Sequence, residues 1–123
     1  MSKSNPATLG PSISDFLKWE STPLTRTTVP AAIGTKAGAF VLYPLRDVAL
    51  IALTDESDGK VVIQPHNCIM DLSLISEDAI ETAYQTTEDE TATVQTMSKL
   101  LDPYGIVFVG TPISSTETGP VGL

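Results

Sequence analysis

The chain has 123 residues, which is enough for one domain with a single small hydrophobic core. It carries 15 acidic and 7 basic side chains, so its net charge is −8 and its pI is about 4.3, and such a surface repels nucleic acid. The sequence has no apolar run near the roughly 20 residues that cross a bilayer, and its N-terminus lacks the apolar stretch of a signal peptide.

The single histidine and the single cysteine leave little room for catalysis. Cys68 has no partner for an internal disulfide, which fits a reducing compartment, and His66 has no second imidazole with which to hold a metal ion. The two residues are two positions apart, so an extended chain places them on one face. A cysteine nucleophile also needs an orienting group and a pocket, so we expect structural roles, with catalysis as the alternative.

The acidic turn and the glycine-rich turns are the other candidate ligand sites in the sequence. Asp55, Glu56 and Asp58 lack the spacing and the distal glutamate of a calcium loop, and they precede a glycine as turn residues do. The glycines of residues 34–59 form no phosphate-binding pattern. We therefore expect no catalytic, cofactor or metal site.

The first 30 residues differ from the rest in composition. Residues 1–12 are small and polar, which predicts a mobile arm in the free protein. Residues 13–20 have the apolar spacing of a short helix, capped by a serine but too short to be stable alone. Leu24 to Val29 is threonine-rich between two prolines, which suits an edge strand or an isolated extended arm. Trp19 lies outside the obvious core, so it docks on a partner or on its own domain.

Residues 31–110 contain the predicted compact domain. The expected strands are 39–43, 47–53, 60–64, 67–72 and 106–109, with a hairpin between the second and the third. Residues 87–90 form a capping box that starts one helix, which carries the apolar stripe of Val94, Met97 and Leu101 and ends at the turn 102–105. Residues 111–123 are expected to form a loose tail. This pattern predicts an α+β, mostly β fold with one late helix.

Two features of this domain suggest contacts between subunits. Ala49 is small and lies in an apolar run, so it allows a neighbouring backbone or subunit to come close. The stripe of the late helix is expected to be core, with a subunit contact as the alternative. The candidate subunit contacts are Ala49, Ile51 and Met97.

Three stretches of the chain, taken together, resemble one protein family. They are residues 16–29, residues 48–70 and residues 87–108, and they cover most of residues 13–109. In their order and spacing they are similar to the lambda-type head decoration proteins of tailed bacteriophages.

The resemblance implies a structural protein without a catalytic site or cofactor. It implies a small β-tulip-like domain that is made in the host cytoplasm and binds as a homotrimer to the major capsid protein, on the outer surface of the expanded virion head. Residues 1–30 would be an extended arm that orders on the shell, and the strand 24–29 would add to a sheet edge of the capsid protein. The implied arm contacts are Phe16, Leu17, Trp19, Leu24, Arg26, Thr28 and Val29.

Two other classes of function are open at this point. One is another small oligomeric β-barrel module, such as an Sm-like ring or a tail-associated phage protein. The other is an enzyme or ligand-binding domain that uses His66, Cys68 or the acidic turn.

Overall fold

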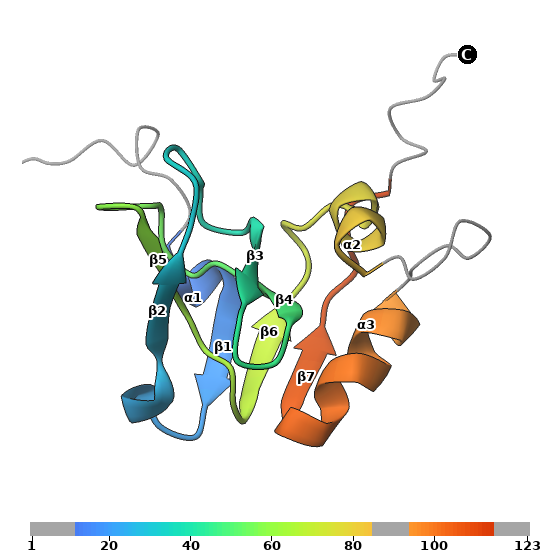
Figure 1. Ribbon diagram of the computed structural model, residues 1–123. Coiled ribbons are helices and arrows are strands. Elements are labelled where there is room, and N and C mark those ends of the chain that lie inside the picture. The colour runs from blue at the N-terminus through green and yellow to red at the C-terminus, as the bar shows by residue number, and fades with distance from the viewer. Residues whose placement is uncertain (1–11, 85–93, 115–123) are drawn as a thin grey trace, which may run out of the picture.

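The computed structural model describes residues 12–84 and 94–114 (Figure 1). Its order of elements is mainly strands, with two full-length helices late in the chain, so the mostly-β α+β class is confirmed. The elements are α1 (Ile13–Phe16), β1 (Leu17–Glu20), η2 (Pro23–Thr25), β2 (Thr27–Pro30), β3 (Phe40–Tyr43), β4 (Val48–Ile51), β5 (Lys60–Ile63), β6 (Cys68–Asp71), α2 (Glu77–Tyr84), α3 (Val94–Leu101), η3 (Asp102–Tyr104) and β7 (Ile106–Val109).

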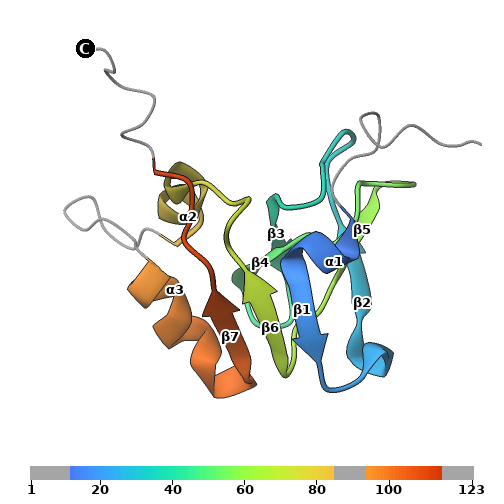
Figure 2. The ribbon, with the colours of Figure 1, turned by 180° about the vertical axis from the view of Figure 1, so that it is seen from behind.

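The described strands form three small sheets. In the first, β6 is central, with β1 antiparallel on one side and β7 parallel on the other. The second pairs β2 with β5, and the third pairs β3 with β4, both antiparallel. Figures 1 and 2 show the β3–β4 ribbon on one face of the molecule and β1 on the opposite face. Helix α3 lies beside β7, at the end of the first sheet away from β1.

One hydrophobic core lies between these layers. Phe16, Leu53, Ile63, Met97 and Leu101 are each 2% exposed or less, and they come from all parts of the described chain. The core therefore joins the first stretch of the chain to the last.

The N-terminal segment is the main difference from the sequence expectation. Residues 13–16 form the capped turn of helix that the spacing predicts, with the backbone N–H of Ser12 donating to Asp15 Oδ2 at 2.7 Å. From Leu17, however, the chain is extended and pairs with β6, and Thr27–Pro30 pairs with β5. The prediction that the compact domain begins at residue 31 is wrong, because residues 12–30 supply two strands and part of the core. Residues 1–11 lie outside the described residues.

The predicted hairpin between residues 47–53 and 60–64 forms only next to its turn, and the prediction that the two strands pair with each other is wrong. Strand β4 pairs with β3, and β5 pairs with β2. The two expected partners meet only just beyond β4, where the Leu53 N–H donates to the Val62 carbonyl at 2.8 Å. A tight turn lies between them, because Ser57 and Lys60 exchange backbone hydrogen bonds at 2.9 and 3.1 Å and the two residues between them have positive φ. Beside this turn, Glu56 accepts hydrogen bonds from the backbone N–H groups of Gly34 and Gly59. Those bonds hold the turn against the loop that follows β2.

Helix α2 was missed by the single-helix prediction. Its N-terminal signal is Ser76, whose Oγ accepts from the Ala79 N–H at 3.0 Å, followed by two acids in the first turn. Ile80 and Tyr84 then face the core at helical spacing. The later helix is observed as α3, while the predicted capping box 87–90 lies outside the described residues.

The end of the domain also differs slightly from the prediction. Ile113 pairs with Ser76 and exchanges backbone hydrogen bonds with Ile75 and Glu77, each at 2.8 Å. The fold therefore continues to residue 114, beyond the predicted boundary at residue 110. Residues 115–123, the rest of the predicted tail, lie outside the described residues.

Candidate interaction surfaces

The predicted arm contacts divide into buried and exposed side chains. Phe16 is 1% exposed, Leu17 8% and Val29 4%, so these three belong to the core and their assignment to a shell contact is wrong. Trp19 is 54% exposed and Leu24 90%. Thr28 is also exposed. The division follows the pairing with β6 and β5, which turns one side of the segment inward.

Arg26 is held by an ion pair inside this segment. Its Nε donates to both carboxylate oxygens of Glu20, at 3.1 and 3.0 Å, and its Nη2 donates to Oε1 as well. The guanidinium lowers the pKa of the Glu20 carboxyl, which raises the pKa of Arg26 in turn. The Arg26 guanidinium is therefore paired with Glu20 within its own chain, where it closes the β1–β2 connection.

Gln64 ties the same connection to the β5–β6 turn. Its side chain is buried and donates from Nε2 to Glu20 Oε2 at 2.6 Å and to the Thr22 carbonyl at 3.1 Å. It also accepts from the Thr25 hydroxyl at 2.7 Å and from the His66 N–H at 3.2 Å. The amide has both donors and its acceptor engaged, which fixes η2 relative to the sheet.

Arg46 joins two further turns at the same end of the molecule. Its guanidinium carbon lies 3.7 Å from the centroid of the Tyr104 ring and 5.2 Å from that of Tyr43. Its Nη2 lies 2.9 Å from His66 Nδ1 and 3.4 Å from His66 Nε2. Among the described residues Nη1 is buried without a hydrogen-bond partner, so stacking on the rings holds this cation.

We call this end of the molecule the turn end, made of residues 21–26, 44–47, 64–67 and 102–105. It is the lower end in Figure 1, where η2, the β3–β4 turn, the β5–β6 turn and η3 meet. Two leucines project from it: Leu24 is 90% exposed and Leu45 is 83% exposed. The Gln64 and Arg46 networks hold the turns that carry these two side chains.

The predicted subunit contacts are not one surface. Ile51 is 4% exposed and Met97 is fully buried, so both pack in the core and their assignment to a subunit contact is wrong. The expectation that the apolar stripe of the late helix is core is confirmed at Met97 and Leu101. Ala49 differs, because it lines an open groove of about 770 Å³ between the β3–β4 ribbon and the helices α2 and α3.

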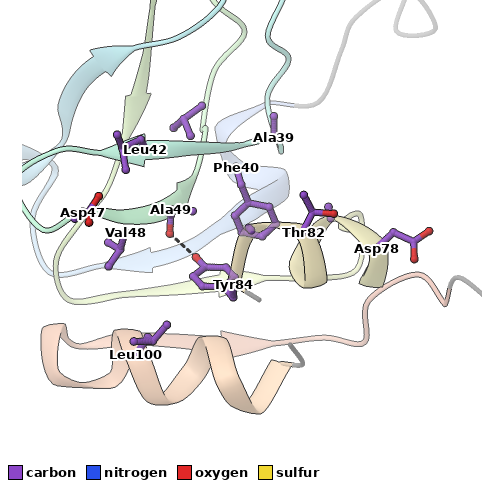
Figure 3. A pocket seen from close by; sticks show the side chains of 13 residues that line it. Ala39, Phe40, Leu42, Asp47, Val48, Ala49, Asp78, Thr82, Tyr84 and Leu100 are labelled. Atoms are coloured by element: carbon purple, nitrogen blue, oxygen red, sulfur yellow. Dashed lines mark hydrogen bonds between the residues drawn. The ribbon is translucent and has the colours of Figure 1, made fainter. Parts of the chain in front are cut away.

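The alanine groove, as we name it, is shown in Figure 3. Its small residues are Ala39, Ala49, Ala79 and Ala83, and its large apolar ones are Phe40, Val41, Leu42, Val48, Tyr84 and Leu100. The Tyr84 hydroxyl donates to the Ala49 carbonyl, and its ring meets Phe40 edge-on with centroids 5.5 Å apart. These contacts join α2 to the ribbon and keep the groove open at a fixed width.

His66 and Cys68 do not form a catalytic pair. His66 faces Arg46, whereas the Cys68 thiol is 1% exposed and donates to the Gln64 carbonyl, with Sγ and O 3.7 Å apart. Burial raises the pKa of Cys68 to about 12, so the thiol stays protonated near neutral pH and is a poor nucleophile.

The carboxylates of the acidic turn hold neighbouring loops by hydrogen bonds. Glu56 Oε1 accepts from the Gly34 N–H at 3.0 Å and Oε2 from the Gly59 N–H at 2.6 Å, and these bonds lower the pKa of the carboxyl. Asp55 accepts from the Ala37 N–H at 2.9 Å. Within residues 12–84 and 94–114, no group of three or more His, Cys, Asp or Glu side chains could hold a metal ion.

Comparison with known proteins places the chain in no family. No protein-family model matches it, and no similar protein was found among the curated proteins or the solved structures. In the described part of the chain, no helix has the length and apolar character needed to cross a membrane.

Proposed function

We propose that the chain is a structural virion protein that binds as a trimer to the outside of an expanded phage head and stabilises the shell against the pressure of the packaged DNA. The proposal is supported by the strand pairing in the structure. Strands from the three stretches that carry the resemblance pair with one another. Strand β1 of the first and β7 of the third flank β6 of the second, and β2 of the first pairs with β5 of the second. The likeness therefore falls on the hydrogen-bonded centre of one folding unit.

The turn end is the surface that we assign to the major capsid protein. It presents Leu24 and Leu45 on a frame held by the Gln64 and Arg46 networks. The acidic turn 55–58 lies at the other end of the molecule (Figure 1), next to the loop that follows β2. Ile33 belongs to that loop and is exposed. This division allows the apolar end to meet the shell while the acidic end faces solvent.

A fixed frame changes the expected mechanism of attachment. Residues 12–30 are ordered in the free protein, so binding through this segment does not incur the free-energy cost of folding an arm. Three copies in a trimer each present the same apolar tips, and one docked copy raises the effective concentration of the others to roughly millimolar. Modest contacts, repeated over the shell, then suffice for stable attachment.

Co-sedimentation with expanded and unexpanded phage shells tests the proposal. Leu24→Asp places a charge at the turn end, and Ile33→Asp is the matched control, because both side chains are 90% exposed and neither is part of the core. We expect wild type and Ile33→Asp to bind expanded shells equally, and Leu24→Asp to bind at least about tenfold more weakly.

Three outcomes would contradict the proposal. If the wild-type chain does not sediment with expanded shells, decoration is excluded. If Leu24→Asp and Ile33→Asp lose shell binding to the same extent, the turn end is excluded as the contact. A native mass of five or more copies supports instead a different ring-forming β module.

A further inference from the structure

The alanine groove accepts something that the described chain does not supply. Ala49, Ala79 and Ala83 are small, while Phe40 and Leu42 beside them are large, and the groove holds about 770 Å³ (Figure 3). Leu42 is 53% exposed, so this apolar hollow faces solvent in a single copy. A hollow of this size has room for a bulky apolar side chain together with the chain on either side of it, entering from another molecule.

A side chain of that kind is exposed on the opposite face. Trp19, the only tryptophan, is 54% exposed on β1, and Figures 1 and 2 place β1 and the β3–β4 ribbon on opposite faces. Tryptophan is the residue type most enriched among those that dominate interface energies. Its exposure here is unlike that of its neighbours Phe16 and Leu17, which are buried.

Charge favours bringing these two faces together. Two copies with a net charge of −8 repel each other, so a contact between them needs opposite charges at its edge. The side chain of Lys18, next to Trp19, is 43% exposed. Asp47 and Asp78, both exposed, line the groove.

We propose that the alanine groove of one copy receives Trp19 of a second copy, with Lys18 of the second copy set beside Asp78 of the first. The inference rests on the proposed function, because it assigns the surfaces by which the trimer forms. The two surfaces differ, so the contact is head-to-tail, and it makes the proposed trimer only if its rotation closes after three copies. A rotation that does not close gives an open filament instead, which would overturn the contact as the basis of the trimer. It retains Ala49 as a subunit contact and moves Trp19 from the shell to the neighbouring copy.

Trp19 is its own reporter of this contact. Wild-type chain is diluted across the dissociation range, and its tryptophan emission is recorded beside its sedimentation velocity. We expect emission at shorter wavelength in the assembled protein than in the dilute one, because the indole leaves water.

Two matched substitutions test the groove itself. Leu42→Glu introduces a charge into the groove, and Leu74→Glu introduces the same charge at a site outside it with the same 53% exposure. We expect Leu42→Glu to weaken assembly at least about tenfold and to leave emission at long wavelength, while Leu74→Glu behaves as wild type. Far-ultraviolet circular dichroism checks that each variant is folded.

Charge reversal tests the orientation. Lys18→Glu weakens assembly, and adding Asp78→Lys restores it. Asp78 is chosen because Asp47 has a positive φ of 55° that a substitution would disturb. The control adds Asp71→Lys instead, because Lys18 Nζ lies 3.9 Å from Asp71 in its own chain. If Asp78→Lys restores assembly of the Lys18→Glu variant and Asp71→Lys does not, the contact is supported. If Asp71→Lys restores it and Asp78→Lys does not, the contact is overturned.

The remaining outcomes separate this inference from the proposed function. If the wild type is a trimer and Leu42→Glu and Leu74→Glu change its assembly to the same extent, the groove contact is overturned. That result leaves the proposed binding to the shell untouched. A chain that stays monomeric, with constant emission at every concentration, overturns both the contact and the proposed trimer.

Discussion

Two regions of the molecule show that composition does not predict burial. They are residues 12–30 and the β3–β4 ribbon, residues 40–51. The first segment is polar, rich in threonine and proline, yet it inserts Phe16, Leu17 and Val29 into the core. The ribbon is nearly all apolar, yet one of its faces lines an open groove. Burial in this protein follows which strand pairs with which, and composition alone does not reveal it.

The same comparison shows how the exposed side chains and the groove arise. In the N-terminal segment, pairing with β6 and β5 fixes one side inward and leaves Trp19 and Leu24 outward. A bulge at Lys18 in β1 shifts the register between Leu17 and Trp19 and so lets two near neighbours face opposite ways. At the ribbon, Tyr84 at the end of α2 contacts Ala49 and Phe40, and the groove lies between the ribbon and the two helices.

The largest effect is expected from deleting residues 1–30. The deletion removes β1, β2 and three core side chains, so we expect a chain without a cooperative unfolding transition. A deletion of residues 1–11 leaves both strand pairings intact and is the control. Circular dichroism during a urea titration measures both. A folded product from the longer deletion would show that the first segment is an appendage after all.

The second test compares one side chain from each region. Phe16→Ala removes a fully buried ring and is expected to cost about 3–5 kcal/mol of the free energy of unfolding. Leu42→Ala, at a half-exposed position of the ribbon, is expected to cost below about 1 kcal/mol. Equilibrium urea unfolding measures the two, and similar values would remove the distinction between the regions.

A third test examines the contact that locks α1 onto the loop before β3. Gly38 has φ +96°, and a methyl group added there would lie 2.8 Å from Cζ of Phe16. We expect Gly38→Ala to destabilise the protein by about 1–3 kcal/mol, from backbone strain and steric overlap together. Gly34→Ala is the control, with φ +91° and open space around its Cβ position, so it carries the strain alone. Thermal unfolding that ranks the two alike would place Phe16 elsewhere.

The smallest expected effect is on the pH dependence of the free energy of unfolding, through the Glu20 carboxyl. The pKa of Glu20 in the folded protein lies below its ordinary value of 4.5, chiefly because of the Arg26 hydrogen bonds. A lowered folded pKa gives stability that is complete above pH 4.5 and is lost as the pH falls through the folded value. We expect Glu20→Gln to remove a contribution of order 1 kcal/mol at neutral pH and to make the unfolding free energy less pH-dependent below 4.5.

Urea midpoints between pH 3 and pH 7 measure this change, with Glu77→Gln at an exposed position of α2 as the control. A residual acid dependence is expected from two other carboxyls with lowered pKa values. The pKa of Glu56 is lowered by hydrogen bonds from the backbone N–H groups of Gly34 and Gly59, and that of Asp71 by the Ser73 hydroxyl and then the Ser73 N–H. Identical pH profiles for wild type and Glu20→Gln would contradict the role of the ion pair.

Local patterns in the sequence predicted most of the strands and the late helix. Alternation, turn glycines and flanking prolines are short-range signals, and they placed β3, β5, β6 and β7 close to their observed bounds. Helix α2 was within reach, since Ser76 and the acids after it are an ordinary helix start.

Strand pairing was out of reach, because β1 finds β6 about fifty residues away and no local pattern records that choice. For the same reason sequence reasoning found Ala49 and Trp19 but not the groove, which three distant elements build. Ile51 and Met97 were misassigned because an apolar stripe looks the same whether it faces a core or a neighbour.

Native-state amide hydrogen exchange on the free protein tests the central claim, that residues 12–30 are built into the domain before any partner binds. We expect the paired amides of β1 and β2 to be protected to within about tenfold of those of β6 and β5, since the same core must open to expose them. Exchange of β1 and β2 at the rate of an unstructured peptide, beside protected β5 and β6, would contradict the account and restore an arm that orders only on its target.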